Sequence, residues 1–178
     1  MTIANLGELR GAVEDILARA DFPSLFPIAV RVFESKFNTA VRVAEMEVAN
    51  ELIVVNGVAV LPANFLELRN VQGQESNPTY YLSGNNLVFT SNAPDFVDVL
   101  YYGKLPALLV DSDTNWLLQG YPHLYLYGVT SELGLALQDS SIVQLYKSLY
   151  ESALDELRNA DLGRRWGGAS IVLTSPTP

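Results

Sequence analysis

The dipeptide Asn56-Gly57 constrains the fold of this chain more than any other short feature. It lies between two runs of branched apolar residues, LIVV and VAVL. Asn-Gly favours the positive φ angles of a two-residue hairpin turn, so the pattern predicts two antiparallel strands joined at this point. A chain that contains this hairpin is not an all-helical protein.

Strand-like patterns continue after the hairpin. The segment TYYLSGNNLVFT predicts a second hairpin that turns at Gly84-Asn85-Asn86, and FVDVLYYG alternates as a further strand. The segment FLELRNV is compatible with a short strand or with a turn of helix. We therefore expect a small antiparallel β lobe at about 45–103.

Helical patterns flank this middle part on both sides. Apolar residues recur at helical spacing over 6–19, where Asn5 can cap the start, and over about 27–40, where Pro27 suits the first turn. After a short turn around Trp116, two more helices are expected, from Pro122 to about Leu137 and from Ser141, which has capping-box spacing to Gln144.

The expected fold class is α+β. It is a helical bundle of two N-terminal and two C-terminal helices, with the small antiparallel β lobe inserted and an extended C-terminal tail. We predict a single domain at 1–161, with its β insertion at about 45–103, and an extended tail at 162–178, because Gly and Pro are frequent after Asp161.

The charge balance makes this chain a poor sequence-independent DNA binder. Eleven Lys and Arg stand against 20 Asp and Glu, so the net charge is 11 − 20 = −9. Such a chain repels a duplex held close to it, which suits DNA that must slide past without sticking. The absence of cysteine excludes disulfides and thiolate chemistry. No signal peptide and no membrane-spanning segment are expected.

A lone histidine, His123, stands among tyrosines in TNWLLQGYPHLYLYGVTSELGLAL. One histidine cannot make a multi-histidine zinc site, and neither HExxH nor the GxSxG elbow occurs. The following helix is apolar on almost every face, which is typical of a helix with neighbours on several sides. We interpret His123 as a packing residue.

Carboxylates offer a second route to catalysis. The pairs are Glu45 with Glu47, which alternate along a predicted strand, Asp111 with Asp113, and Asp155 with Glu156. A glycosidase needs two carboxylates in different environments, and surface charge explains these pairs adequately. Phosphate-binding glycine motifs do not occur. We expect no catalytic residue, no cofactor and no metal site.

The last residues carry a binding pattern instead. GRRWGG combines two arginines with a tryptophan, a composition common at protein interfaces. Trp166 folding back on its own helix is the alternative. The following segment SIVLT has the composition of a strand that could pair with another chain.

An ordered set of segments resembles the head–tail adaptor (connector) proteins of tailed bacteriophages. The resemblance extends from about Pro27 to Ile171 and is carried by FESKFNTAVRVAEMEV, VLPANFLELRNV, LYYGKLPAL, TNWLLQGYPHLYLYGVTSELGLAL and RRWGGASI. LPANFLELR followed by NWLL and YPHLYLYG is its strongest part.

The resemblance implies a structural virion protein and not an enzyme. It implies a ring, dodecameric like the portal, that lies at the neck under the portal, extends the DNA channel and offers a platform for tail or nozzle proteins. Genomic DNA would pass without specific binding, no membrane is involved, and the protein is made in the host cytoplasm. By resemblance we assign portal or neighbour-subunit contact to the tail residues Arg164, Arg165, Trp166, Ile171 and Leu173.

Two alternatives stay open at this point. The chain could be a peptidoglycan hydrolase of the tail that uses a carboxylate of the β lobe, Glu45 above all. It could also be a monomeric binding module, which predicts no assembly with portal.

Overall fold

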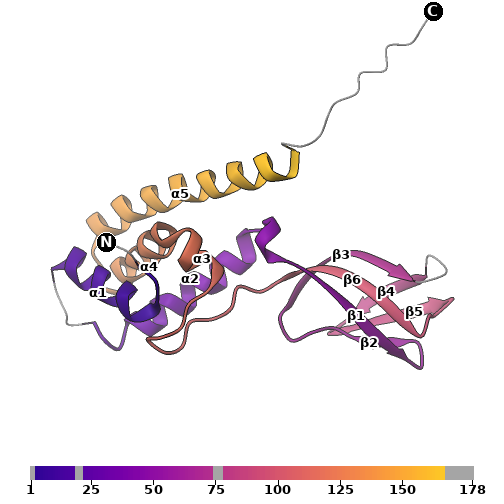
Figure 1. Ribbon diagram of the computed structural model, residues 1–178. Coiled ribbons are helices and arrows are strands. Elements are labelled where there is room, and N and C mark those ends of the chain that lie inside the picture. Colours follow the sequence, from indigo (N-terminus) through magenta and orange to yellow (C-terminus); the bar gives the residue numbers. More distant parts are fainter. Residues whose placement is uncertain (1–2, 19–21, 74–77, 167–178) are drawn as a thin grey trace, which may run out of the picture. The chain divides into compact units, whose positions relative to one another are not determined.

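The computed structural model describes residues 3–18, 22–73 and 78–166 of the chain. Close packing divides the chain into two units, Met1–Phe33 with Ala107–Pro178, and Glu34–Pro106. The first unit is helical, and the second contains all the described strands (Figure 1). The fold class is therefore α+β, as the sequence predicts.

The described part of the chain has five α-helices. Asn5 caps the first, as expected, because its side-chain oxygen accepts a hydrogen bond from the Glu8 N–H at 2.9 Å. Pro122 occupies the first turn of the fourth. The helices are α1 (Leu6–Leu17), α2 (Phe26–Ala40), α3 (Trp116–Gly120), α4 (Pro122–Ala136) and α5 (Ser140–Trp166).

Helix α4 lies in the middle of the helical unit, packed against α1, α3 and α5. Leu124, Val129 and Leu133 are fully buried, which explains why almost every face of this helix is apolar. At Gly128 an added Cβ would lie 2.3 Å from the Phe33 ring of α2, so only glycine allows this close approach of the two helices.

The C-terminal helix differs from the prediction at both ends. Asp139, and not Ser141, caps it, because the Asp139 carboxylate accepts hydrogen bonds from the N–H groups of Ser141 and Ile142. Its far end reaches Trp166, so 162–166 are helical where an extended tail was predicted. Gly163 causes no break, since isolated glycine costs a helix only about 1 kcal/mol.

The strands form a single six-stranded antiparallel sheet. Their order is β3-β6-β1-β2-β5-β4. Strand β1 links the two halves of this curled sheet, because it pairs with β6 over most of its length and with β2 at its end (Figure 1). The strands are β1 (Glu47–Val55), β2 (Val58–Val60), β3 (Phe65–Gly73), β4 (Thr79–Ser83), β5 (Asn86–Ser91) and β6 (Phe96–Gly103).

Both hairpin turns occur where the sequence predicts them. Asn56 and Gly57 join β1 to β2 with φ angles of 52° and 75°, as a type I′ turn requires. In the second hairpin Ser83 pairs with Asn86, so the turn consists of Gly84 and Asn85 alone and is one residue shorter than expected.

One face of the sheet encloses a small core of its own. Tyr101 of β6 lies within it, and its hydroxyl donates to the Asn64 side chain at 3.1 Å and accepts from Asn50 at 3.3 Å. Because side chains alternate between faces along a regular strand, every second residue of most strands points into this core, and β3 is the exception. The buried members are Ala59, Val71, Leu87, Phe89, Val97, Val99 and Tyr101.

The predicted helical bundle with a small inserted β lobe is wrong. The strands build a large six-stranded sheet with a core of its own, in a unit separate from most of the helices. The sequence FLELRNV, for which a short strand or a turn of helix was expected, lies in the nine-residue strand β3. Two register shifts in its pairing with β6 break the two-residue alternation that would have identified it. The predicted division into a domain at 1–161 and a tail at 162–178 stays a prediction.

Candidate interaction surfaces

The last turn of α5 carries two of the residues predicted to contact a partner. The Arg165 Nε donates to the Asp161 carboxylate, a largely buried group, at 2.7 Å. Arg164 donates to the Tyr121 hydroxyl at 3.4 Å. Positive charge is favourable at a helix C-terminus, so this end of α5 accommodates both arginines. Their contacts with Asp161 and Tyr121 orient the two side chains.

The structure shows less of the other three predicted contact residues. Trp166 is the last residue of α5. Ile171 and Leu173 lie outside the described residues, so the five are not seen together. The structure thus brings Arg164 and Arg165 together on one helical turn, and the assignment of all five to a partner stays a prediction.

His123 lies in the first turn of α4, between two tyrosines. Its ring centroid is 6.3 Å from that of Tyr121 and 6.2 Å from that of Tyr127, and its Nε2 is 3.8 Å from the Glu156 carboxylate of α5. Ser152 lines the same shallow pocket, but no hydrogen bond joins it to His123. A nucleophile activated by a base requires such a bond, so this cluster is not an assembled triad.

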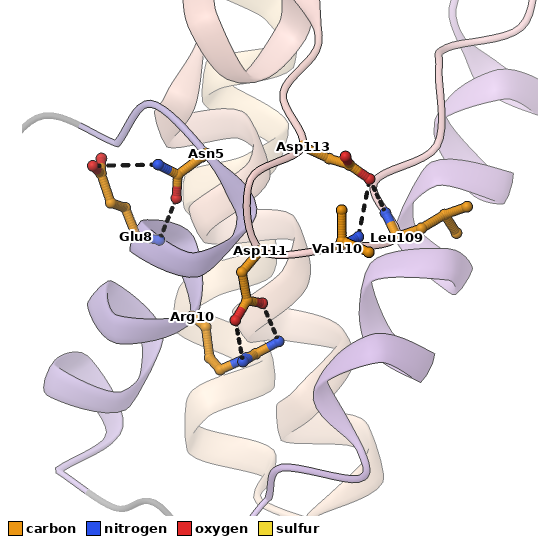
Figure 2. Close-up of polar contacts among 7 residues, drawn as sticks. All are labelled: Asn5, Glu8, Arg10, Leu109, Val110, Asp111 and Asp113. Atoms are coloured by element: carbon orange, nitrogen blue, oxygen red, sulfur yellow. Dashed lines mark hydrogen bonds and ion pairs between the residues drawn. The ribbon is translucent and has the colours of Figure 1, made fainter.

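Two further acidic residues, Asp111 and Asp113, hold the loop that leads into α3 against α1. Asp111 forms a salt bridge with Arg10, with a shortest distance of 2.7 Å, as Figure 2 shows. The backbone carbonyls of Asp111 and Asp113 accept from the N–H groups of Gly7 and Leu6, which have no partner within the helix. The loop therefore completes the N-terminus of α1.

Asp113 fixes the turn inside this loop. Its carboxylate accepts from the N–H groups of Leu109 and Val110 at 2.8 and 2.9 Å (Figure 2). The hydrogen bond from Val110, and then that from Leu109, lowers the pKa of Asp113 below its ordinary value. A carboxylate held ionised in this way is a structural group and a poor proton donor.

The other acidic pairs have contacts of the same kind. Glu47 forms a salt bridge with Arg69 of β3, and Asp155 lies 3.5 Å from Arg158 one turn away. Glu45 lies in the 3₁₀ turn η1 (Ala44–Met46) before β1. The expectation that Glu45 and Glu47 alternate along one strand is therefore wrong, because β1 begins at Glu47.

The described ranges contain neither a metal-binding cluster nor a membrane-spanning helix. Among those residues, no group of three or more His, Asp or Glu side chains is arranged to hold a metal ion. None of the helices described has both the length and the apolar character to cross a bilayer.

The sheet carries a surface that sequence reasoning missed. Four apolar side chains of its outer face are between 40% and 66% exposed: Ile53, Val55, Val60 and Phe96. Ile53 and Phe96 are opposite each other on β1 and β6. A signal for this surface is the unbroken run LIVV, because a strand with four consecutive apolar residues must present some of them on each face.

The outer face has a polar part as well. On β1 and β6, Glu51 and Asp98 are direct cross-strand partners, and Asp98 also pairs with Gln72 of β3. Two like charges in this position destabilise a sheet. They border a hollow lined by residues of β1, β3 and β6. The outer face is thus acidic toward β3 and apolar toward β2.

The comparison with protein families identifies the class of this chain. Residues 72–173 match the family described as SU10 adaptor protein, which is more than half of the sequence. The chain belongs to this family of phage adaptor proteins, so the resemblance seen in the sequence is confirmed. No curated protein matches the chain.

Membership gives the general role. The family is structural and non-enzymatic, and its members associate with other components of the virion. The protein is accordingly a structural adaptor of a bacteriophage particle.

Proposed function

We propose that this protein is the head–tail adaptor at the neck of the phage. It forms a ring, dodecameric by resemblance, under the portal, extends the DNA channel and provides the platform for tail or nozzle proteins. The single observation that carries the proposal is the family match over residues 72–173.

The charge of the chain supports passage of DNA through such a ring. A net charge of −9 disfavours a tight grip on phosphates. Genomic DNA then crosses the ring without specific contacts, and its rate of passage is not limited by release from the wall.

A closed ring needs two unlike faces on each subunit, because a heterologous contact repeats around an axis. The basic last turn of α5 and the sheet with its exposed apolar residues are unlike in charge and in shape. In this proposal Arg164, Arg165, Trp166, Ile171 and Leu173 contact the portal or the neighbouring subunit.

Native mass spectrometry of the full chain with purified portal tests this function. We expect the adaptor to join the portal as a ring of defined stoichiometry. A variant that lacks 167–178 retains all of α5 and the Arg165–Asp161 contact, and we expect it to fold but to join portal weakly. Normal portal binding by this variant would remove the proposed contact of Ile171 and Leu173 with the portal.

No observation favours the hydrolase alternative. The contacts of Glu47, Asp111, Asp113 and Asp155 are those of structural carboxylates. A Glu45→Gln variant assayed on purified cell wall addresses the remaining candidate, and we expect neither the variant nor the parent protein to cleave it.

A further inference from the structure

We propose that the C-terminal segment 170–174 of one copy of this chain adds a strand to β4 of a neighbouring copy. The inference rests on the proposed ring and names the contact between its subunits. It begins from a difference between the two edges of the sheet.

Strand β4 forms an unprotected edge of the sheet. It is the last strand on its side among those described, and all five of its residues, Thr79–Ser83, are exposed. Its sequence TYYLS contains no charge and no proline, and its one register shift lies at its first residue, between Thr79 and Tyr80. Edge strands of folded proteins usually carry charged residues, prolines or bulges, because their unpaired backbone groups can otherwise bind another strand.

The opposite edge, β3, has these protections. Its pairing with β6 contains two register shifts, and it carries the charged residues Glu67 and Arg69. The Arg42 Nε, from the segment after α2, donates to the Glu67 carboxylate at 2.7 Å. Of the two edges of the sheet in the described ranges, β4 is therefore the better suited to accept a strand.

The pairing of β4 with β5 shows which backbone groups face outward. In a two-residue hairpin the residues that flank the turn, here Ser83 and Asn86, exchange both hydrogen bonds, and bonded and non-bonded pairs then alternate. Tyr81 is thus bonded to Val88, whereas the N–H and C=O groups of Tyr80 and Leu82 point to the open edge. In agreement, Phe89, opposite Tyr80, donates its N–H to Gly57 on the other side.

The side chains at this edge are also incompletely covered. Tyr80 and Leu82 lie on the core face, opposite Phe89 and Leu87. They are 37% and 48% exposed, whereas Phe89 and Leu87 are 8% and 0% exposed. The core of the sheet is open on the β4 side, and a further strand beside β4 would cover it.

The C-terminal sequence fits this edge chemically. Residues 167–178, GGASIVLTSPTP, contain no charge, and Ile171, Val172 and Leu173 would present apolar groups to both faces. Pro176 would end the pairing. Twelve residues span up to about 40 Å when extended, enough to leave the end of α5 for another subunit. Strand addition supplies main-chain hydrogen bonds, and alternate side chains supply specificity.

A second copy of the chain is the occupant that the ring requires. The edge and the segment are unlike surfaces, and every subunit carries one of each. A contact between them is heterologous and repeats around an axis, as a closed ring demands. Each subunit would give its segment to one neighbour and receive the segment of the other.

Hydrogen exchange of the full chain tests the contact. We expect the amides of Tyr80 and Leu82 to exchange about tenfold more slowly as the protein concentration rises from monomeric to assembled, since pairing closes the edge. A synthetic peptide of residues 167–178 added to the dilute full chain should slow the same amides.

Two substitutions at one position separate the backbone contribution from the side chain. Leu82→Pro removes an outward N–H without touching the bonds to β5, and we expect about tenfold weaker peptide binding. Leu82→Ala keeps the N–H and should bind the peptide more tightly than Leu82→Pro. Unchanged protection of the β5 amides in both variants shows that the sheet is intact.

Two results would overturn the proposal. Slow exchange at Tyr80 and Leu82 that does not depend on concentration, with no room for the peptide, would mean that the segment pairs within its own chain. Fast exchange under all conditions and no peptide binding would mean that the edge is not its site. Portal binding is measured separately, so a chain that joins portal but fails this test loses only the strand contact.

Discussion

The two units of this protein differ in the groups that they leave exposed at their surfaces. In the helical unit, polar side chains hold the chain to itself: Asp111 binds Arg10, Asp113 fixes a turn and Arg165 binds Asp161. The sheet unit has ion pairs as well, such as that of Arg69 with Glu47, and both units expose apolar side chains, but the sheet also leaves the backbone edge of β4 open. The difference between the units is therefore the open strand edge, which is the part of the sheet that we propose as a binding surface.

The largest expected effect is a difference in unfolding free energy between variants of Leu82 and Leu87, the two leucines that pair across β4 and β5. Leu87 is fully buried, so Leu87→Ala should lower the free energy of unfolding by about 2–5 kcal/mol. Leu82 faces the same core but is 48% exposed, and Leu82→Ala should cost less than about 1 kcal/mol in the monomer. Urea denaturation measures both, and equal losses would mean that the β4 edge is already covered in the free chain.

The next comparison is between alanine substitutions of two glycines in the helical unit, Gly128 and Gly11. Gly128→Ala places a Cβ 2.3 Å from the Phe33 ring and should destabilise the protein by about 1–3 kcal/mol through overpacking. Gly11→Ala in α1 meets no atom within 4 Å and should stabilise it by about 0.5–1 kcal/mol. Thermal denaturation of the two variants should shift in opposite directions. A stabilising Gly128→Ala would show that α2 and α4 can separate at little cost.

The two arginines at the end of α5 should differ in how much they contribute to the free energy of unfolding. Arg165→Met removes the partner of a largely buried carboxylate, so we expect a loss of about 1–2 kcal/mol in unfolding free energy. Arg164→Met removes an exposed contact and should cost less than about 0.5 kcal/mol. Arg164 is therefore the cleaner probe of portal contact, and a large loss of stability in Arg164→Met would assign it to the scaffold instead.

The smallest expected effect is the pH dependence contributed by Asp113. Its pKa is lowered in the folded protein, so its contribution to stability is present above the ordinary pKa of 3.8 and is lost as pH falls through the lower folded value. An Asp113→Asn variant should lose less stability than the parent protein between pH 5 and acid. Parallel pH profiles for the two proteins would show that the turn does not depend on the carboxylate.

Sequence patterns predicted the elements that local chemistry determines. Asn5 as a helix cap, Asn56-Gly57 as a hairpin and Pro122 as a helix start depend on a few neighbouring residues, and all three are confirmed. The extent of the sheet was missed because β3 joins it through long-range pairing with two register shifts. Those shifts hide the alternation that a single strand would show.

The candidate surfaces were harder to predict for the same reason. The composition of RRW predicted a contact surface, but in an extended tail and not in the last turn of a helix. Nothing in TYYLS alone says that it forms an edge, because an edge is defined by the strands around it. The Arg165–Asp161 contact was also missed, although the four-residue spacing of the two on one helix is a signal that could have found it.

The most direct test of this account is the native mass of the full chain, measured alone and after mixing with its portal. The account predicts that the adaptor and portal form one ring-shaped complex of fixed stoichiometry, with as many adaptor as portal subunits. An adaptor that remains monomeric and separate from the portal at all concentrations would contradict it.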